Sequence, residues 1–203
     1  MSTPNGAGDR PVVRVVIAED EAIIRMDLRE MLIEEGYDVV AECANGEAAL
    51  EAVAALGADL AVLDVKMPVL DGISAARILT EERACAVVLL TAFSQRELIE
   101  SARDAGVLGY VVKPFEKSDL IPAIEMSLGR FREIVSLTVR ADDLAAQLEN
   151  RKIAERAKGA LIARHAMSEA EAFAYLQRTA MNERRTMRDI ADAVLRGELP
   201  VNT

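Results

Sequence analysis

Five polar positions of this 203-residue chain follow short apolar runs, and their side chains suit phosphoryl chemistry. Glu19 and Asp20 follow the first run, Asp64 the third, Thr91 the fourth and Lys113 the fifth. Three carboxylates crowded together repel one another unless a cation lies among them. An oxygen-rich set of this kind suits Mg²⁺, which keeps several waters and binds phosphate as well. One carboxylate can then attack a phosphoryl group and form an acyl phosphate, and Asp64, central by strand order, is the candidate nucleophile.

The other two positions carry groups that would serve the transferred phosphoryl group. Lys113 supplies a positive charge for its oxygens, and the hydroxyl of Thr91 can donate a hydrogen bond to them. Taken singly, each position has a plainer explanation, since an aspartate after a strand commonly caps the next helix and a Lys-Pro pair commonly marks a loop. Five coincident positions at the same end of one sheet favour the chemical interpretation.

These positions depend on strands and helices that alternate along the chain. Short apolar runs predict strands at residues 12–17, 38–43, 60–63, 86–90 and 109–112. Apolar residues at helical spacing predict helices at residues 22–35, 45–57, 73–82 and 96–105, and from about residue 118. Strict alternation predicts an α/β fold with a five-stranded parallel sheet that helices cover on both faces. The functional crevice of such a sheet lies at the carboxyl ends of the strands, where the five polar positions would meet.

Residues 12–128 resemble the receiver domain of two-component response regulators, which has a flavodoxin-like (βα)5 fold. The matching segments are residues 15–20, 63–68 with Asp71 and Gly72, 90–92 and 109–115. The resemblance implies that a sensor histidine kinase phosphorylates Asp64. It also implies a phosphoacceptor regulator rather than an enzyme, with only slow self-catalysed gain and loss of the phosphoryl group.

The same resemblance implies a Mg²⁺ site. Asp20 and Asp64 would bind the ion, Glu19 would act through a water molecule, and the backbone carbonyl of Lys66 would be a further ligand. A cis peptide bond after Lys113 is also implied, and it would direct the lysine side chain into the site.

Members of the family switch by coupling a hydroxyl group to an aromatic ring, and the corresponding residues here are Thr91 and Tyr110. Phosphorylation adds about two negative charges and several hydrogen-bond acceptors. Thr91 would move towards the phosphoryl group and leave space into which Tyr110 can turn. This movement would repack the face made by the fourth helix, the fifth strand and the fifth helix.

The chain beyond residue 118 predicts helices only. Residues 129–150 form a coiled-coil-like linker with apolar residues spaced alternately by three and four: Ile134, Leu137, Ala141, Leu144 and Leu148. This seam would pack on its own protein or join two copies, so that a phosphorylation-dependent homodimer is one expectation. Two further helices are predicted to start at residues 168–171, which match a capping box, and at residues 186–189. Gly197 predicts the end of the last helix.

Residues 151–198 resemble the ANTAR domain, an all-α three-helix output module of transcription antiterminators, whose first helix would continue from the long connecting helix. The matching positions are Ile153, residues 157–159, Leu161, residues 168–173, Leu176, residues 180–181 and 184–191. The resemblance implies binding to paired RNA hairpins, which prevents a terminator from forming.

Basic side chains of this segment could contact phosphates or stack on loop bases. The candidates are Lys158, Arg164, Arg178, Arg184, Arg185 and Arg188. Phe173 is expected in the core, so ring stacking would depend on Tyr175 and on arginines.

The net charge of −10 is unevenly distributed, because residues 131–203 hold nearly equal numbers of acids and bases. The acidic first part disfavours nucleic-acid binding there. No apolar run approaches the roughly 20 residues of a membrane helix, and the start shows no secretory signal. Cys43 and Cys85 have neither metal spacing nor a disulfide framework. We therefore expect a cytoplasmic protein without a membrane partner, and a disordered tail at residues 1–11.

The sequence leaves three alternative functions possible. A DNA-binding response regulator would need a helix-turn-helix, and residues 182–186 could supply its turn, although residues 157–159 fit an ANTAR domain better. An aspartyl-phosphate phosphohydrolase of the haloacid dehalogenase type would need a second acid two residues after the nucleophile, where this chain has Lys66. A protein-interaction adaptor, whose tail only dimerises, is the third.

Overall fold

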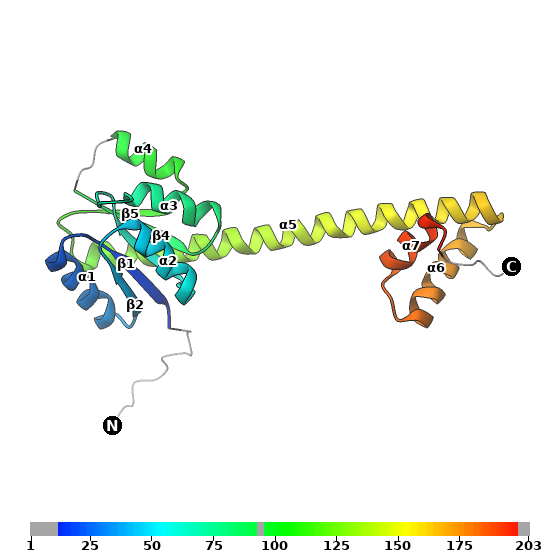
Figure 1. Cartoon of the computed structure of the whole chain (residues 1–203), viewed down its shortest axis with the longest axis horizontal. Helices are drawn as coiled ribbons and strands as arrows, with labels where there is room; N and C mark the ends of the chain where they lie inside the picture. Colours follow the sequence, from blue (N-terminus) through cyan, green and yellow to red (C-terminus); the bar gives the residue numbers. More distant parts are fainter. Residues whose placement is uncertain (1–11, 93–95, 199–203) are drawn as a thin grey trace, which may run out of the picture. The chain divides into compact units, whose positions relative to one another are not determined.

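A computed structural model of the chain describes residues 12–92 and 96–198, without the side chains of residues 96–99 (Figure 1). The tail expected at residues 1–11 lies outside the described residues. The chain divides into two compact units, Met1–Val135 and Ser136–Thr203, and each is described by itself.

The first unit is built on a sheet of five parallel strands. The strands are β1 (Arg14–Ala18), β2 (Asp38–Cys43), β3 (Leu60–Asp64), β4 (Ala86–Thr91) and β5 (Gly109–Val112). Their order in the sheet is β2-β1-β3-β4-β5. The strand order reverses between β1 and β3, and in open α/β sheets the binding crevice lies at the carboxyl ends of the strands beside such a point. The predicted α/β fold with five parallel strands is confirmed.

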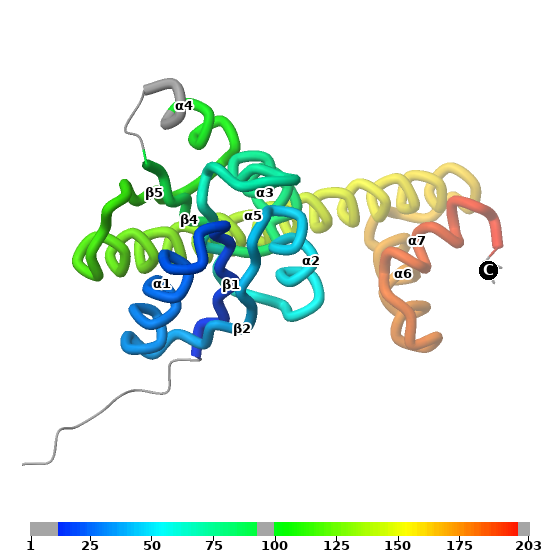
Figure 2. The backbone as a smooth tube through the Cα atoms, turned by 60° about the vertical axis from the view of Figure 1, so that its left-hand side comes forward, coloured from blue at the N-terminus to red at the C-terminus, as the bar shows by residue number. Residues whose placement is uncertain are grey.

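Helices cover both faces of this sheet (Figure 2). They are α1 (Ala22–Glu34), α2 (Gly46–Leu56), α3 (Gly72–Glu81), α4 (Arg96–Asp104) and the first part of α5 (Lys117–His165). Successive side chains of a strand point to opposite faces, so β1 serves two cores. Val16 belongs to the core that includes Val53 of α2, whereas Ile17 belongs to the core that includes Leu28 of α1 and Ile124 of α5.

The central strand β3 ends in a charged residue although it is buried throughout. Each of its five positions is buried, and Asp64 is the last of them. A carboxylate that is removed from bulk water is costly unless hydrogen-bond donors or cations surround it. The fold therefore requires partners for Asp64 at this edge of the sheet.

The second unit consists of three helices: the part of α5 from residue 136 onward, α6 (Glu169–Glu183) and α7 (Met187–Arg196). The predicted long connecting helix is confirmed, because α5 continues without a break for 49 residues. The apolar sides of the three helices form a core of Ile153, Ala157, Leu161, Ala172, Leu176, Ile190, Ala191 and Val194. This arrangement confirms the predicted all-α fold of the second unit.

Capping boxes begin both short helices of the second unit. The hydroxyl of Ser168 accepts a hydrogen bond from the Glu171 N–H, and the Glu171 carboxylate accepts one from the Ser168 N–H. Thr186 and Asp189 make the same exchange at the start of α7. Gly197 ends α7 with a φ of 76°, a conformation that glycine adopts readily. The start and stop signals predicted for these helices are confirmed.

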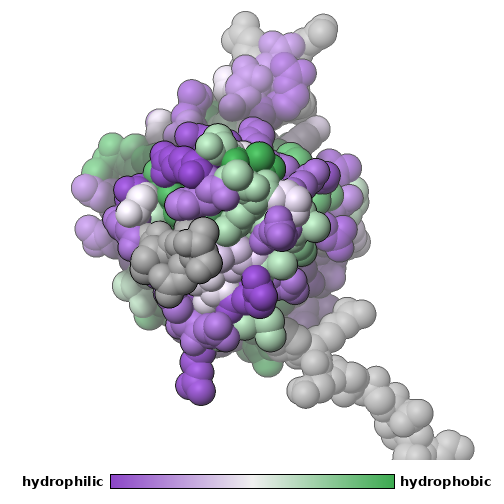
Figure 3. All heavy atoms as spheres, turned by 90° about the vertical axis from the view of Figure 1, so that its right-hand side faces the viewer, coloured by the Kyte–Doolittle hydropathy of each residue, from purple (hydrophilic) through white to green (hydrophobic). Residues whose placement is uncertain are grey.

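Polar side chains cover most of the surface that Figure 3 shows, with small apolar areas between them. Among the helices in residues 12–92 and 96–198, none combines the length and the apolar character needed to cross a membrane.

Candidate functional site

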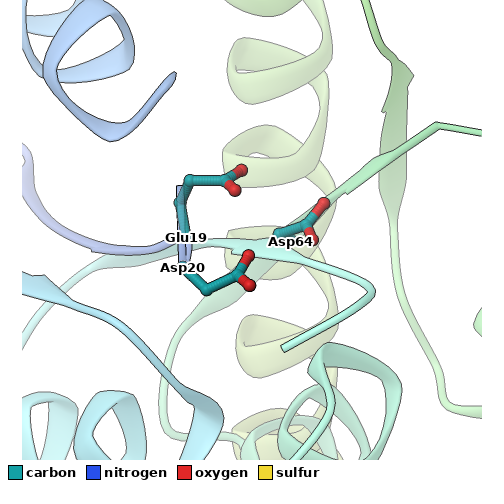
Figure 4. Close-up of side chains that lie close together, drawn as sticks. All are labelled: Glu19, Asp20 and Asp64. Carbon is teal, nitrogen blue, oxygen red and sulfur yellow. The ribbon is translucent and has the colours of Figure 1, made fainter. Parts of the chain in front are cut away.

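Three carboxylates lie together at the carboxyl ends of β1 and β3 (Figure 4). Ala18 pairs with Leu63 across these parallel strands, so Glu19 and Asp64, the residues that follow, leave the sheet side by side. With Asp20, they place one oxygen each within 4.8 Å of the other two. Asp20 is exposed, whereas Glu19 and Asp64 are buried. The structure thus brings the three predicted acids together.

Lys113 adds a positive charge to this cluster from the end of β5. Its ammonium nitrogen lies 2.5 Å from Oε2 of Glu19 and 2.7 Å from Oδ1 of Asp64. The backbone N–H of Lys113 donates a 2.7 Å hydrogen bond to the carbonyl of Thr91, which holds this end of β5 against β4. The peptide bond between Lys113 and Pro114 is cis, as predicted.

Burial and charge act in opposite directions on the ionised groups of this cluster. Burial raises the pKa of Glu19, the hydrogen bond from Lys113 lowers it, and the charge of Asp64 raises it again, so that the pKa lies above the ordinary glutamate value. Burial lowers the pKa of Lys113, but the hydrogen bonds and charges of Asp64 and Glu19 outweigh this effect and raise the pKa. Lys113 is therefore a permanent cation here, and ionised Glu19 is held at a cost.

The loop after β3 orients the carboxylate of Asp64. Its Oδ2 accepts a 3.0 Å hydrogen bond from the backbone N–H of Lys66. Gly72 packs against the backbone of Asp64 from the other side, since a Cβ on Gly72 would lie only 2.0 Å from the Asp64 carbonyl oxygen. The Gly72 N–H also donates a 3.0 Å hydrogen bond to the carbonyl of Val65. Any side chain at position 72 would collide with the backbone of Asp64, so this fold requires the glycine that follows Asp71.

A cavity of about 220 Å³ opens beside the cluster. Its lining residues are Asp20, Glu21, Asp64, Val65, Lys66, Thr91, Ala92 and Lys113. The side chain of Asp64 is only 8% exposed, and that exposed part faces this cavity. The carboxylate is therefore buried towards the sheet but open to a small group that enters from the cavity.

The donor set of the cavity fits a hard divalent cation. Carboxylate and carbonyl oxygens at a site that still admits water are the ligands that Mg²⁺ uses in proteins. Glu19, Asp20 and Asp64 supply carboxylates, and Lys66, whose backbone carbonyl is the predicted further ligand, lines the cavity. A cation among the three acids would also relieve their mutual repulsion.

The two residues of the predicted switch lie on the neighbouring strands β4 and β5 but differ in exposure, and further residues join the site. Thr91 is buried and lines the cavity, whereas Tyr110 on β5 is exposed and does not line it. Glu21 lines the cavity as well, and its backbone N–H donates a 3.2 Å hydrogen bond to Oε1 of Glu19. The guanidinium of Arg25 donates to the Glu19 carbonyl at 2.5 Å. Sequence reasoning missed Glu21 and Arg25, whose only signal was their position in the segment that follows β1.

The basic residues predicted for RNA binding differ in their surroundings. Arg164, Arg178, Arg184, Arg185 and Arg188 are exposed. Lys158 is only 9% exposed, and its ammonium lies 2.9 Å from Glu155 and 3.0 Å from Glu169.

The expectation for the two aromatic rings of α6 was wrong. Phe173, expected in the core, is 46% exposed, whereas Tyr175 is half-buried and packs against the core of the second unit. Ala172 and Leu176, four residues apart, form the buried stripe of α6. Phe173 comes one residue after Ala172 and is therefore turned about 100° away from that stripe.

Comparison with known proteins gives two family matches. Residues 15–125 match the response regulator receiver domain, and residues 142–195 match the ANTAR domain. The chain is 52% identical over 196 residues to the transcriptional regulatory protein PdtaR of Mycobacterium tuberculosis, and the match covers 96% of both chains. It is 34% identical over 116 residues to the chemotaxis protein CheY of Bacillus subtilis, which covers 57% of this chain and 97% of CheY.

Solved structures of receiver domains resemble the first unit. The signal receiver domain of a modulated diguanylate cyclase from Desulfovibrio desulfuricans has a TM-score of 0.56 at 29% identity, covering 60% of this chain and 97% of that one. A two-component response regulator of the LuxR family from Aurantimonas has a TM-score of 0.54 at 32% identity, covering 58% and 86%. With its five-stranded parallel sheet, its acid cluster and its three-helix second unit, the chain belongs to the two-component response regulators that join a receiver domain to an ANTAR domain.

Proposed function

We propose that a sensor histidine kinase phosphorylates this protein on Asp64, and that the protein then controls gene expression by binding RNA hairpins and preventing termination. The observation that carries the proposal is the position of Lys113, whose ammonium contacts Asp64 beside two further acids. The Lys113 ammonium lies beside the Asp64 carboxylate, where it can stabilise the negative charge of a transferred phosphoryl group. The activity would belong to the cytoplasm, where transcripts are made.

In the proposed transfer, a carboxylate oxygen of Asp64 attacks the phosphorus of a phosphohistidine. A new oxygen–phosphorus bond forms, the nitrogen–phosphorus bond breaks, and the imidazole of the kinase leaves with the bonding electron pair. Lys113 and the hydroxyl of Thr91 hold the oxygens of the transferred group. Mg²⁺, held by Asp20, Asp64 and the Lys66 carbonyl with Glu19 acting through water, would supply neutralisation of the phosphoryl charge.

The response would pass from Asp64 to the outer face of β4 and β5. Thr91 lies at the cavity and Tyr110 is exposed on the next strand, where Leu89 pairs with Tyr110. Movement of the Thr91 hydroxyl towards the phosphoryl group would free space for the Tyr110 ring. Such a change in packing is the ordinary way in which a local charge reaches a distant surface.

Exposed leucines on the linker part of α5 support a homodimer, and we propose that it forms on phosphorylation. Leu137, Leu144 and Leu148 are exposed on this helix, at spacings that place them on one side. Apolar residues at alternating spacings of three and four form the contact seam of coiled coils. Light scattering should show a dimer after phosphorylation, and replacing Leu144 and Leu148 by serine should leave a monomer.

Two measurements test the proposal. Acetyl phosphate with Mg²⁺ should label the wild type but not Asp64→Asn, and equal labelling of both would reject Asp64 as the acceptor. Hairpin RNA and duplex DNA, compared at one salt concentration, should show preference for the RNA. Preference for the duplex would favour a DNA-binding regulator.

A further inference from the structure

A cavity in the second unit combines cationic, aromatic and apolar side chains. It has a volume of about 550 Å³, within the roughly 300–1,000 Å³ of ordinary ligand pockets. Its lining residues are Asn150, Arg151, Ala154, Glu155, Lys158, Phe173, Thr186, Met187 and Arg188. All three helices of the unit contribute, so the cavity exists only in the folded unit.

Helical spacing explains how α5 builds one wall of this cavity. Ile153 and Ala157, four residues apart, face the core. Ala154 and Lys158 each come one residue later, so they line the cavity at the edge of the core. The ammonium of Lys158 is already held by Glu155 and Glu169, which makes it part of the wall rather than a group open to a ligand.

The other two cations of the cavity, Arg151 and Arg188, are accessible to an anion. Arg151 is exposed and forms no ion pair with any residue in the described ranges. Arg188 is exposed and donates a 3.1 Å hydrogen bond to the side-chain oxygen of Asn150. Its Nε is 3.9 Å from Asp192, a distance too long for a tight pair. Arg151 and Arg188 are thus the two cations that the cavity presents to a ligand, and they favour a negatively charged partner.

Phe173 gives the cavity a flat apolar ring that the core does not use. The side chain is 46% exposed on α6, and Ala154 and Met187 add apolar surface near it. A basic groove with an accessible aromatic ring is the combination that proteins use to bind unpaired nucleotides, because every base has a face that can stack. A regular duplex cannot offer such a face, since its bases are stacked on one another.

We propose that this cavity receives one unpaired base of an RNA hairpin loop, which stacks on Phe173 while Arg151 and Arg188 hold the neighbouring phosphates. The inference rests on the proposed RNA-binding function and locates its base-reading contact. Phe173 thereby takes the stacking role that the sequence alone gave to Tyr175, whose ring packs against the core.

Replacement of Phe173 tests the stacking contact in the full-length chain, with and without acetyl phosphate and Mg²⁺. The probe is a hairpin with a fixed stem and a randomised loop, enriched for binding to the wild type. Phe173→Leu, which keeps apolar volume but removes the ring, should weaken binding by about 5-fold to about 150-fold, the value of one base–aromatic stack. Phe173→Tyr should keep the wild-type affinity. Met181→Ala is the matched control, because Met181 is 72% exposed on the same helix and does not line the cavity.

Salt dependence separates the ring from the cations. Arg151→Ala should reduce the slope of affinity against salt by about one unit, because one phosphate contact is lost. Phe173→Leu should leave the slope unchanged. A Tm equal to that of the wild type shows that a variant is folded, so that misfolding does not explain its weaker binding.

The outcomes distinguish failure of the RNA-binding function from failure of the proposed base-stacking cavity. If enrichment on the wild type yields no binding hairpin, either with or without acetyl phosphate, the RNA-binding function fails and the cavity proposal with it. If the wild type binds but Phe173→Leu binds equally well, the cavity proposal alone is wrong. Equal binding of duplex DNA with the same loss in Phe173→Leu would also overturn it, because the ring would then contact something other than an unpaired base.

Discussion

The ammonium nitrogen of Lys113 lies 2.7 Å from Oδ1 of Asp64, and this contact joins the end of β5 to the end of β3. The other oxygen of Asp64 accepts a 3.0 Å hydrogen bond from the backbone N–H of Lys66. Both oxygens are therefore oriented before a phosphoryl donor arrives. Groups that are held in place in this way need little rearrangement during a reaction.

Glu19→Gln should change how stability depends on pH. Because the pKa of Glu19 is raised in the folded protein, the folded state binds this proton more tightly than the unfolded state does. Wild-type stability should therefore fall as pH rises from the ordinary glutamate value through the raised one. The variant lacks this titration, so its free energy of unfolding should increasingly exceed that of the wild type across the window.

Urea unfolding without Mg²⁺, at several values between about pH 4 and about pH 8, measures this effect. Glu51→Gln on the exposed side of α2 is the control and should follow the wild type. Parallel curves for wild type and Glu19→Gln would contradict the raised pKa.

Gly72→Ala should destabilise the first unit, because the added Cβ would meet the Asp64 carbonyl oxygen at 2.0 Å. Overpacking of this kind costs about 1–3 kcal/mol or more, and the shifted backbone should also slow labelling of Asp64. Gly129→Ala is the matched comparison, because nothing lies within 4 Å of its Cβ and it stands inside α5. That change should stabilise the protein by about 0.8–1.0 kcal/mol. Equal Tm values for the two variants would refute the steric argument.

Val69→Asn should stabilise the loop that follows β3. Val69 has a φ of 68° and is 77% exposed, and the Leu70 N–H donates a 2.8 Å hydrogen bond to the Pro68 carbonyl across it. A β-branched residue is strained in this region, whereas asparagine tolerates it, so we expect a gain of about 0.5–1 kcal/mol. Val69→Thr keeps the branch and should bring no gain. Chemical denaturation measures the free energy of unfolding of the wild type and the two variants. If the threonine variant is as stable as the asparagine variant, backbone strain at Val69 is not the cause of the gain.

Lys158→Met should loosen the second unit rather than only weaken RNA binding. The Lys158 ammonium lies between Glu155 and Glu169, which connects α5 to the start of α6. Amide hydrogen exchange in the first turn of α6 should therefore become faster. Lys152→Met, which removes an exposed lysine paired with Glu149 on the same helix, should leave this exchange unchanged. Unchanged exchange together with lost RNA binding would instead make Lys158 an RNA contact.

Local signals in the sequence predicted much of this molecule. The alternation of apolar runs and helical periods is a property of neighbouring residues, and it predicted the parallel sheet and the order of the helices. Capping signals such as the one that pairs Ser168 with Glu171 act within one helical turn, so they can be read without the fold. The position of Glu19, Asp20, Asp64 and Lys113 after successive strands likewise predicted where they would gather.

Contacts between distant elements were decided only by the tertiary structure. Helical spacing separates Phe173 from Ala172 and Leu176, but the packing of the three helices decides that the stripe of Ala172 and Leu176 is the one that is buried. The carboxylates around Lys158 come from two helices, and the close approach of Gly72 to Asp64 depends on the path of a loop. A sequence states which residue types are available and at what spacing. Which side chain then faces a cavity, a core or a counter-ion depends on how whole elements dock, and that is settled by the sum of many weak contacts rather than by any local pattern.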